Sequence, residues 1–173
     1  MRNENWSVFE EQQRWAKIAE YIYFASRPWA KNLADIKDFR DKDIDAEDQN
    51  KYVEFKCEPR AIKSRNFYVE LRNASNKKHN GQGYFYYSEA DYICFIDMRE
   101  CIIHWFDFAS FRKWLLNAPF EVYTNGEDSG YLLPICCLWD WAYKGKHFTQ
   151  KFDKKILDEA LKKYGIKDIN AVS

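Results

Sequence analysis

Four side chains that could act together lie on two short alternating stretches, one on each side of a polar turn. Asp43 and Asp45 share one face of residues 42–46, while Glu54 and Lys56 share one face of residues 52–57. Because side chains alternate between the faces of a strand, pairing the two stretches as a hairpin would put all four on one side of a sheet. Clustered carboxylates repel one another unless they are solvated or hold a hard cation such as Mg²⁺ or Mn²⁺. A lysine among them can help activate water and counter charge on a phosphate, so these residues suit phosphodiester hydrolysis.

The alternative is an ordinary solvated hairpin that carries alternating charges on its exposed face. Three features of the surrounding sequence favour a site instead. An acidic residue precedes Glu54-Phe55-Lys56 by the length of a hairpin, an amphipathic segment precedes both stretches, and an alternating apolar stretch follows them.

Hydrophobic periodicity predicts the elements that must position this hairpin. Apolar residues recur at spacings of three and four over about 5–26, the period of a helix, and Arg27-Pro28 ends that segment. The same reading predicts a short turn or helix at 88–91, strands over 66–71, 92–96, 102–106 and 131–137, a helix that begins after Asp107, and a last helix over about 153–164 that Gly165 ends. The order of elements predicts an α/β sandwich with a mixed sheet flanked by helices.

Length and composition exclude several classes of protein. The 173 residues amount to one domain, and 27 basic residues balance 27 acidic ones, which argues against a histone-like protein or an acidic tail. The aromatic content of 18% is too high for a disordered chain. The sequence contains no run of about 18 apolar residues, so it predicts no membrane span. The polar first residues do not resemble a signal peptide. Five cysteines without a Cys-x-x-Cys pattern are typical of reduced thiols, so we expect a cytoplasmic protein without a membrane partner.

The hairpin and its neighbours resemble the PD-(D/E)XK nuclease superfamily. Asp-Ile-Asp-Ala at 43–46 is similar to the strand that supplies the first acidic ligand of that superfamily, and Glu54-Phe55-Lys56 resembles its (D/E)-x-K strand. Residues 66–70 and 83–92 are similar to a branch common in phages and mobile elements, in which an Asn-x-x-x-Glu strand precedes a glycine-led segment with Ala-Asp-Tyr. Two departures are the lack of a proline before Asp43 and a phenylalanine where valine or isoleucine is commoner.

The resemblance implies a fold, a metal and a substrate. It implies a restriction-endonuclease-like core of helix, three-strand meander, helix and strand over about 9–106, with 107–173 as a C-terminal extension of a single domain, 1–173. It implies that Asp43, Glu54 and the backbone carbonyl of Phe55 hold Mg²⁺, for which Mn²⁺ can substitute, and that Asp43, Glu54 and Lys56 are catalytic. We therefore expect a metal-dependent endonuclease that hydrolyses DNA, phage-encoded and acting in the host cytoplasm if viral.

Three further carboxylates are auxiliary candidates. Asp45 competes with Asp43 for the ligand role, although the spacing of Asp43 to Glu54 fits the family better. Glu70 could be an extra ligand or an orienting group, or an exposed strand residue. Some members of the family place a glutamate of the first helix near the metal, for which Glu11 is the first choice, with Glu10 and Glu20 as rivals.

The stretch after the hairpin is basic and then aromatic. The residues expected to contact nucleic-acid phosphates are Arg60, Lys63, Arg65, Arg72, Lys77 and Lys78. The aromatic run at 84–87 could stack on bases or belong to the core.

Two other functions stay open at this point. The chain could keep the fold without cleaving, as a nucleic-acid-binding or protein-binding counter-defence protein. It could also be a resolvase of the Holliday-junction type, which needs a homodimer, and the aromatic-rich residues 133–148 could form the dimer interface or complete the core.

Overall fold

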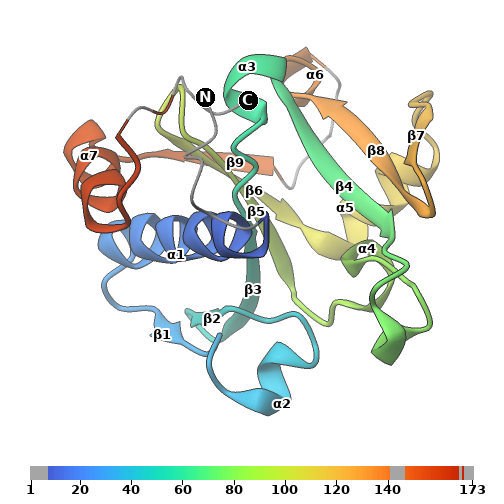
Figure 1. The fold of residues 1–173 in the computed structure, drawn as a ribbon, viewed down its shortest axis with the longest axis horizontal. Helices are drawn as coiled ribbons and strands as arrows, with labels where there is room; N and C mark the ends of the chain where they lie inside the picture. The colour runs from blue at the N-terminus through green and yellow to red at the C-terminus, as the bar shows by residue number, and fades with distance from the viewer. Residues whose placement is uncertain (1–7, 141–146, 168, 170–173) are drawn as a thin grey trace.

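The computed structural model describes residues 8–140, 147–167 and 169 (Figure 1). Its helices are α1 (Val8–Ser26), α2 (Lys37–Arg40), α3 (Ala61–Ser64), the 3₁₀ turn η1 (Lys77–His79), α4 (Tyr84–Tyr87), α5 (Phe108–Leu116), α6 (Cys137–Asp140) and α7 (Lys154–Lys163). Its strands are β1 (Lys31–Asn32), β2 (Ala46–Asp48), β3 (Lys51–Lys56), β4 (Asn66–Arg72), β5 (Tyr92–Asp97), β6 (Ile102–Asp107), β7 (Val122–Asn125), β8 (Asp128–Pro134) and β9 (His147–Lys151). Residues 5–7 of the first predicted helix, and 141–146 of the stretch suggested for a dimer interface, lie outside the described residues.

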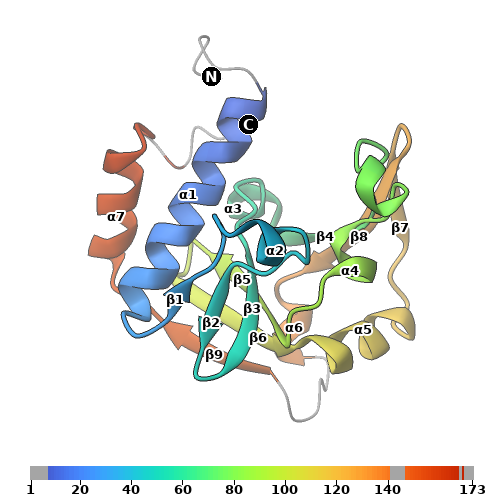
Figure 2. The same ribbon diagram turned by 90° about the horizontal axis from the view of Figure 1, so that it is seen from below.

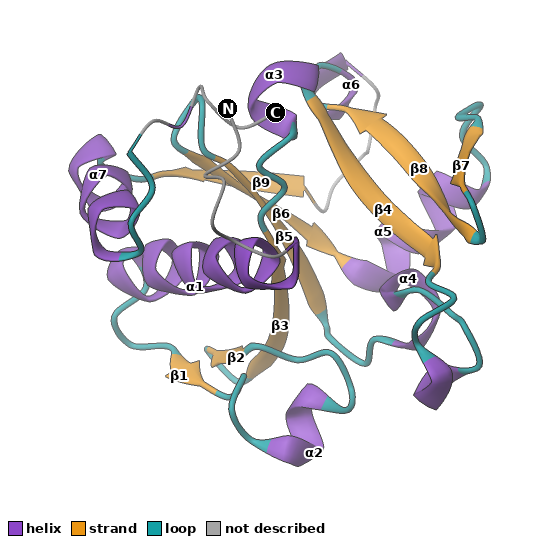
Figure 3. Ribbon diagram, viewed as in Figure 1, coloured by secondary structure: helices purple, strands orange, loops and turns teal. Residues whose placement is uncertain are grey.

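The main sheet has six strands in the order β1-β2-β3-β5-β6-β9 (Figure 3). β3 and β5 are parallel, whereas the other neighbours are antiparallel, so the sheet is mixed. Helices flank this sheet, and the predicted α/β class is therefore confirmed. No helix in the described part of the chain is long and apolar enough to cross a membrane.

The hairpin of β2 and β3 forms, but its first strand lies later than predicted. Gln49 and Asn50 both have positive φ, 51° and 62°, as in the two-residue turn that matches strand twist. The prediction of a strand over 42–46 is wrong, because the backbone after α2 bends back on that helix: the Ile44 N–H donates to the Phe39 carbonyl at 3.1 Å, and Asp43 has a φ of 56°. The alternation itself is kept, since Ile44 is buried and Asp43 is partly exposed.

The third strand of the predicted meander does not belong to the main sheet. β4 forms where it is expected, with Phe67 and Val69 fully buried, but it pairs with β8 in a separate sheet of order β4-β8-β7. The strand beside β3 is β5, which runs parallel to it. Alternation predicts a half-buried strand but not its partner, and here the partner comes much later in the chain. β8 also begins and ends earlier than the predicted strand over 131–137.

The two faces of the main sheet carry different layers (Figure 2). α1 and α7 cover one face, where their apolar side chains share one core cluster with Val53 and Phe55 of β3. The second sheet, α4 and α5 lie over the opposite face, where Phe67 stacks on Phe95 with ring centroids 4.8 Å apart. Glu54 and Lys56 alternate with Val53 and Phe55, so they point toward this second side.

A buried carboxylate ties the end of β2 to the end of α1. Asp48 is 3% exposed and accepts hydrogen bonds from Arg27 Nε at 2.6 Å, Trp29 Nε1 at 2.9 Å and the Tyr23 hydroxyl at 3.1 Å. Arg27 also lies over the Trp105 ring at 5.0 Å. The hairpin is thereby held to the helix that covers the Phe55 face.

We expect Asp48→Ala to lower the free energy of unfolding by about 3–5 kcal/mol, because it leaves the largely buried Arg27 without its carboxylate partner. Glu47→Ala is the matched control, since this neighbouring carboxylate pairs with Lys31, whose side chain is 70% exposed, and the variant should cost at most about 1 kcal/mol. Urea denaturation measures both values. Equal losses in the two variants would show that Asp48 does not hold the hairpin.

Candidate active site

The β3 strand brings Glu54 and Lys56 together between the two sheets. Glu54 is only 2% exposed, and its Oε1 forms an ion pair with the Lys56 ammonium. Lys56 Nζ also lies 3.3 Å from Asp43 Oδ2 and 4.3 Å from the centre of the Tyr84 ring. The residues predicted to be catalytic are therefore in contact, with Lys56 between the two carboxylates.

Asp43 is positioned from a distant part of the chain. The Ser88 hydroxyl donates to the Asp43 carbonyl at 3.1 Å, and the Glu89 N–H donates to the Lys42 carbonyl at 2.9 Å. Arg112 of α5 in turn donates from Nη2 to the Ser88 carbonyl at 2.7 Å. The turn that carries Asp43 is thus fixed against the segment between α4 and β5. No local pattern in the sequence signals the roles of Ser88 and Arg112, which were not among the predicted site residues.

Asp45 has a different task from Asp43. Its N–H donates to the Val53 carbonyl at 2.9 Å, and its Oδ2 accepts the Phe55 N–H at 3.0 Å. The carboxylate therefore replaces a backbone acceptor where the β2–β3 ladder ends. The Phe55 carbonyl faces the same edge, because the N–H and C=O of a strand residue point the same way. Asp45 Oδ2 has this role, whereas Asp43 Oδ2 lies 3.3 Å from the Lys56 ammonium.

Burial and mutual repulsion shift the pKa values of these groups. Burial, partly offset by Lys56, raises the pKa of Asp45 to about 6. Burial, followed by the nearby Asp43 and Asp45, raises the pKa of Glu54 well above its usual value. Burial alone would lower the pKa of Lys56, but Asp43, Glu54 and Asp45 outweigh it and raise that pKa. Lys56 is accordingly held as a cation among carboxylates that outnumber it.

The side chains around Lys56 have the oxygen chemistry of a hard divalent cation site but not its close grouping. Glu54 Oε2 is buried and has no hydrogen-bond partner among the described residues, although a side-chain hydrogen bond with the Glu54 carboxyl helps to lower the pKa of Asp45. The carboxyl groups of Asp43, Asp45 and Glu54 outnumber the Lys56 ammonium, and oxygen ligands suit Mg²⁺ or Mn²⁺. Within residues 8–140, 147–167 and 169, however, no three His, Cys, Asp or Glu side chains are grouped closely enough to hold a metal. Lys56 occupies the place between Asp43 and Glu54.

Of the other auxiliary carboxylates, Glu70 lies near the candidate site and Glu11 does not. Glu70 borders the same pocket as Lys56, and burial raises its pKa, which Lys56 in turn lowers. Gly83 approaches Glu70 so closely that a Cβ at this position would lie 2.4 Å from the Glu70 carbonyl oxygen. Glu11 lies on α1, which packs on the face of β3 that carries Phe55, so the structure does not bring it to the Glu54 side.

Some of the basic residues predicted to contact DNA instead pair with carboxylates of the protein. Arg65 forms two hydrogen bonds to the buried Asp97, at 2.8 and 3.0 Å, and Lys78 forms an ion pair with Asp41. Both have partners within the protein, and Arg65 serves the fold. The exposed members of the predicted set are Arg60, Lys63, Arg72 and Lys77, together with the paired Lys78.

Comparison with known proteins gives no family for the chain. No family model matches the sequence, and no curated protein or solved structure shows significant similarity to it. The chemistry of the described residues is therefore the basis for assigning a function.

The raised pKa of Asp45 makes stability depend on pH. Between about pH 4 and pH 6 the folded protein keeps the Asp45 proton that the unfolded chain releases, so stability falls as the pH rises through this window. Asp45→Asn removes this titration but keeps an oxygen for the Phe55 N–H. Without added metal, we expect the free energy of unfolding of this variant to equal that of wild type near pH 4 and to exceed it by about 1–3 kcal/mol near pH 7.5.

Thermal unfolding of both proteins across the pH series measures this difference. Asp35→Asn, at a side chain that is 86% exposed, is the control and should change little at either pH. A difference between Asp45→Asn and wild type that is constant with pH would contradict the buried-carboxylate account.

Proposed function

We propose that this chain is a Mg²⁺-dependent endonuclease that hydrolyses DNA phosphodiester bonds, with Asp43, Glu54 and Lys56 as its catalytic residues. The observation that carries the proposal is the contact of Lys56 with both carboxylates, beside a buried Glu54 oxygen that lacks a partner among the described residues.

In this proposal Asp43, Glu54 and the Phe55 carbonyl hold the cation. A bound Mg²⁺ lowers the pKa of water and neutralises charge on phosphate oxygens. Glu54 would then serve as a ligand rather than as the ion-pair partner of Lys56. The Lys56 ammonium would orient the attacking water and counter the charge that develops on the phosphate. Asp45 keeps the Phe55 backbone in place through the 3.0 Å hydrogen bond to its N–H.

We also propose a restriction-endonuclease-like core. Support comes from α1 packed on the β2–β3 hairpin and from the β5–β6 hairpin beside it in the mixed sheet. β4 is a departure from the expected meander, because it pairs with β8 in a second sheet. This core accounts for the order in which the acidic turn and the Glu-x-Lys strand follow the first helix.

One observation favours a second function, a fold that binds nucleic acid or protein without cleaving. Lys56 already forms an ion pair with Glu54 and lies between it and Asp43. In the described part of the chain, no three His, Cys, Asp or Glu side chains are grouped closely enough to hold a metal ion. In that case the ion pair would be permanent, and added metal would not change the protein.

Asp43→Asn and Glu54→Gln should each abolish Mg²⁺-dependent cleavage of DNA while the metal-free variants stay folded. Each amide keeps the shape of the side chain but removes the charge that a cation needs. Cleavage of plasmid and of linear duplex, with Mg²⁺, Mn²⁺ or EDTA, measures activity. Wild-type cleavage that continues in EDTA would show that the reaction does not need a divalent cation.

Lys56→Ala and a double replacement of Arg60 and Lys63 by alanine should separate chemistry from binding. Lys56→Ala should lower single-turnover cleavage by about 10²–10³, with little change in DNA affinity. The double variant should weaken binding and reduce the slope of log K against log salt by about 0.9 for each phosphate that the protein no longer neutralises. If Lys56→Ala instead abolishes binding, and wild type cleaves no form of DNA, the non-cleaving function replaces the nuclease.

A further inference from the structure

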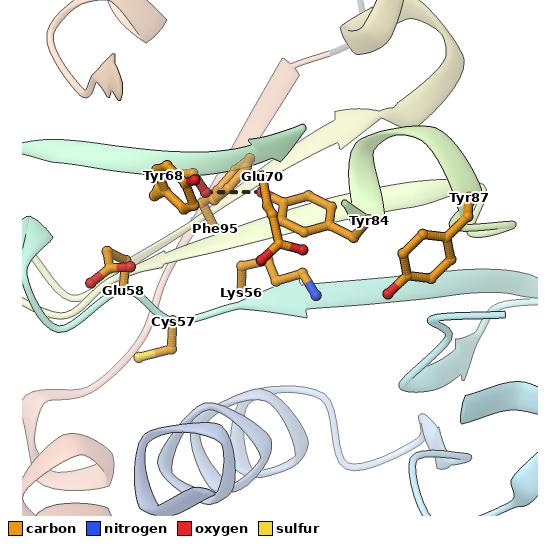
Figure 4. Close-up of a pocket in the computed structure, with 8 residues that line it drawn as sticks. All are labelled: Lys56, Cys57, Glu58, Tyr68, Glu70, Tyr84, Tyr87 and Phe95. Atoms are coloured by element: carbon orange, nitrogen blue, oxygen red, sulfur yellow. Dashed lines mark hydrogen bonds between the residues drawn. The ribbon is translucent and has the colours of Figure 1, made fainter. Parts of the chain in front are cut away.

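A small pocket adjoins the candidate active site and is not explained by metal binding. It has a volume of about 190 Å³, and its lining includes Lys56, Glu58, Glu70, Tyr84, Tyr87 and Phe95. In Figure 4 the side chains of Lys56 and Glu70 converge in the middle of the pocket, with Tyr84 and Tyr87 at one end and Glu58 at the other. Because Lys56 also contacts Asp43 and Glu54, a group in this pocket would lie next to the reacting phosphate.

The lining suits a flat, neutral ring with N–H donors. Phe95 is 1% exposed and forms an apolar wall. The Tyr87 ring borders the pocket and is braced by His79, whose ring stacks on it at 3.8 Å and 5°. Tyr84 is fixed by its hydroxyl, which donates to the Tyr68 carbonyl at 3.0 Å. These aromatic walls are held in place before any ligand arrives, which lowers the entropic cost of binding.

The carboxyl groups of the pocket disfavour a phosphate inside it. Glu70 and Glu58 both border the pocket, where the two carboxyl groups outnumber the Lys56 ammonium. The Asn73 amide donates to Glu70 Oε2 at 3.2 Å, which orients that side chain. Carboxyl oxygens accept hydrogen bonds from the amino groups of nucleobases, whereas they repel a second anion. A base, rather than a phosphate, is the complementary part of a nucleotide.

The size of the pocket excludes a base pair. Typical small-molecule sites measure roughly 300–1,000 Å³, so a volume of about 190 Å³ takes a single ring system. A base inside a duplex would have to leave the stack to enter, at a cost of a few kcal/mol, and an already unpaired base avoids most of this cost.

We propose that this pocket receives one unpaired nucleobase beside the scissile phosphate, so that the preferred substrate is DNA with single-stranded or extrahelical nucleotides. The inference rests on the proposed function for the position of the phosphate. Its test can be run without cleavage, because base binding in the pocket does not need the metal.

The experiment uses the full chain in EDTA and two DNA probes that contain the fluorescent base 2-aminopurine, one as a single-nucleotide bulge and one fully paired. Anisotropy gives affinity, and 2-aminopurine fluorescence reports stacking. The variants are Tyr87→Ala and Tyr87→Phe, and the matched control is Tyr86→Ala, on the same helix but 52% exposed. We expect wild type to bind the bulge at least about tenfold more tightly than the duplex and to quench its fluorescence.

Tyr87→Ala should lose roughly tenfold or more in affinity for the bulge and nothing for the duplex, Tyr87→Phe should keep most of the preference, and Tyr86→Ala should match wild type. Two results would overturn the proposal that the pocket binds a base. One is that wild type leaves the fluorescence of the bulged base unquenched. The other is that Tyr87→Ala weakens binding to both probes equally, or to neither. If the protein prefers the bulge but cleaves no DNA with Mg²⁺ or Mn²⁺, the base-binding proposal stands and the nuclease proposal fails. If the protein cleaves DNA without preferring the bulge, the nuclease proposal stands and the base-binding proposal fails.

Discussion

The ion pair of Lys56 with Glu54 and Asp43 is the interaction that constrains the rest of this structure. A glutamate that is 2% exposed cannot stay charged without a cation, and Lys56 is the cation that β3 supplies two residues later. One ammonium faces three carboxyl groups, and the raised pKa values of Asp45 and Glu54 show that burial and mutual repulsion favour retaining protons there. A bound divalent cation would be the largest local charge in such a cluster and would favour the deprotonated carboxylates.

Several distant elements are needed to keep this cluster together. The turn of positive φ at Asp43 is held by Ser88, and Ser88 is held by Arg112 of α5. The tight turn at Gln49 and Asn50 sets the register that puts Asp45 beside the Phe55 N–H. On the other face of β3, Tyr23 of α1 stacks on Phe55 with ring centroids 4.8 Å apart. Repulsion among the carboxylates is thus opposed by packing on both sides of the strand.

Local sequence patterns predicted the elements better than their partners. The alternation around Val53 and Phe55, the Asp107 that caps α5 and the Gly165 after α7 all appear where periodicity and capping rules placed them. The assignment of β4 to the main sheet was wrong, because its partner β8 is set by long-range packing that alternation does not encode.

The candidate site was predictable to a similar extent. Glu54 and Lys56 follow from the period of a strand, and they do share a face. Asp43 reaches Lys56 by a different route from the one expected, through a turn rather than along a strand. Arg65 was expected to contact DNA, but its pairing with Asp97 depends on a buried acid far along the chain, which no local pattern reveals. The same holds for Ser88 and Arg112.

The most direct test of the central claim is a crystal of the protein soaked in Mn²⁺ and measured at a wavelength where manganese scatters anomalously. The account predicts one strong anomalous peak between Asp43 and Glu54, with the Phe55 carbonyl oxygen directed at it and Lys56 moved off Glu54. A map without that peak, in which Lys56 still pairs with Glu54, would contradict the account and leave the cluster as a structural ion pair.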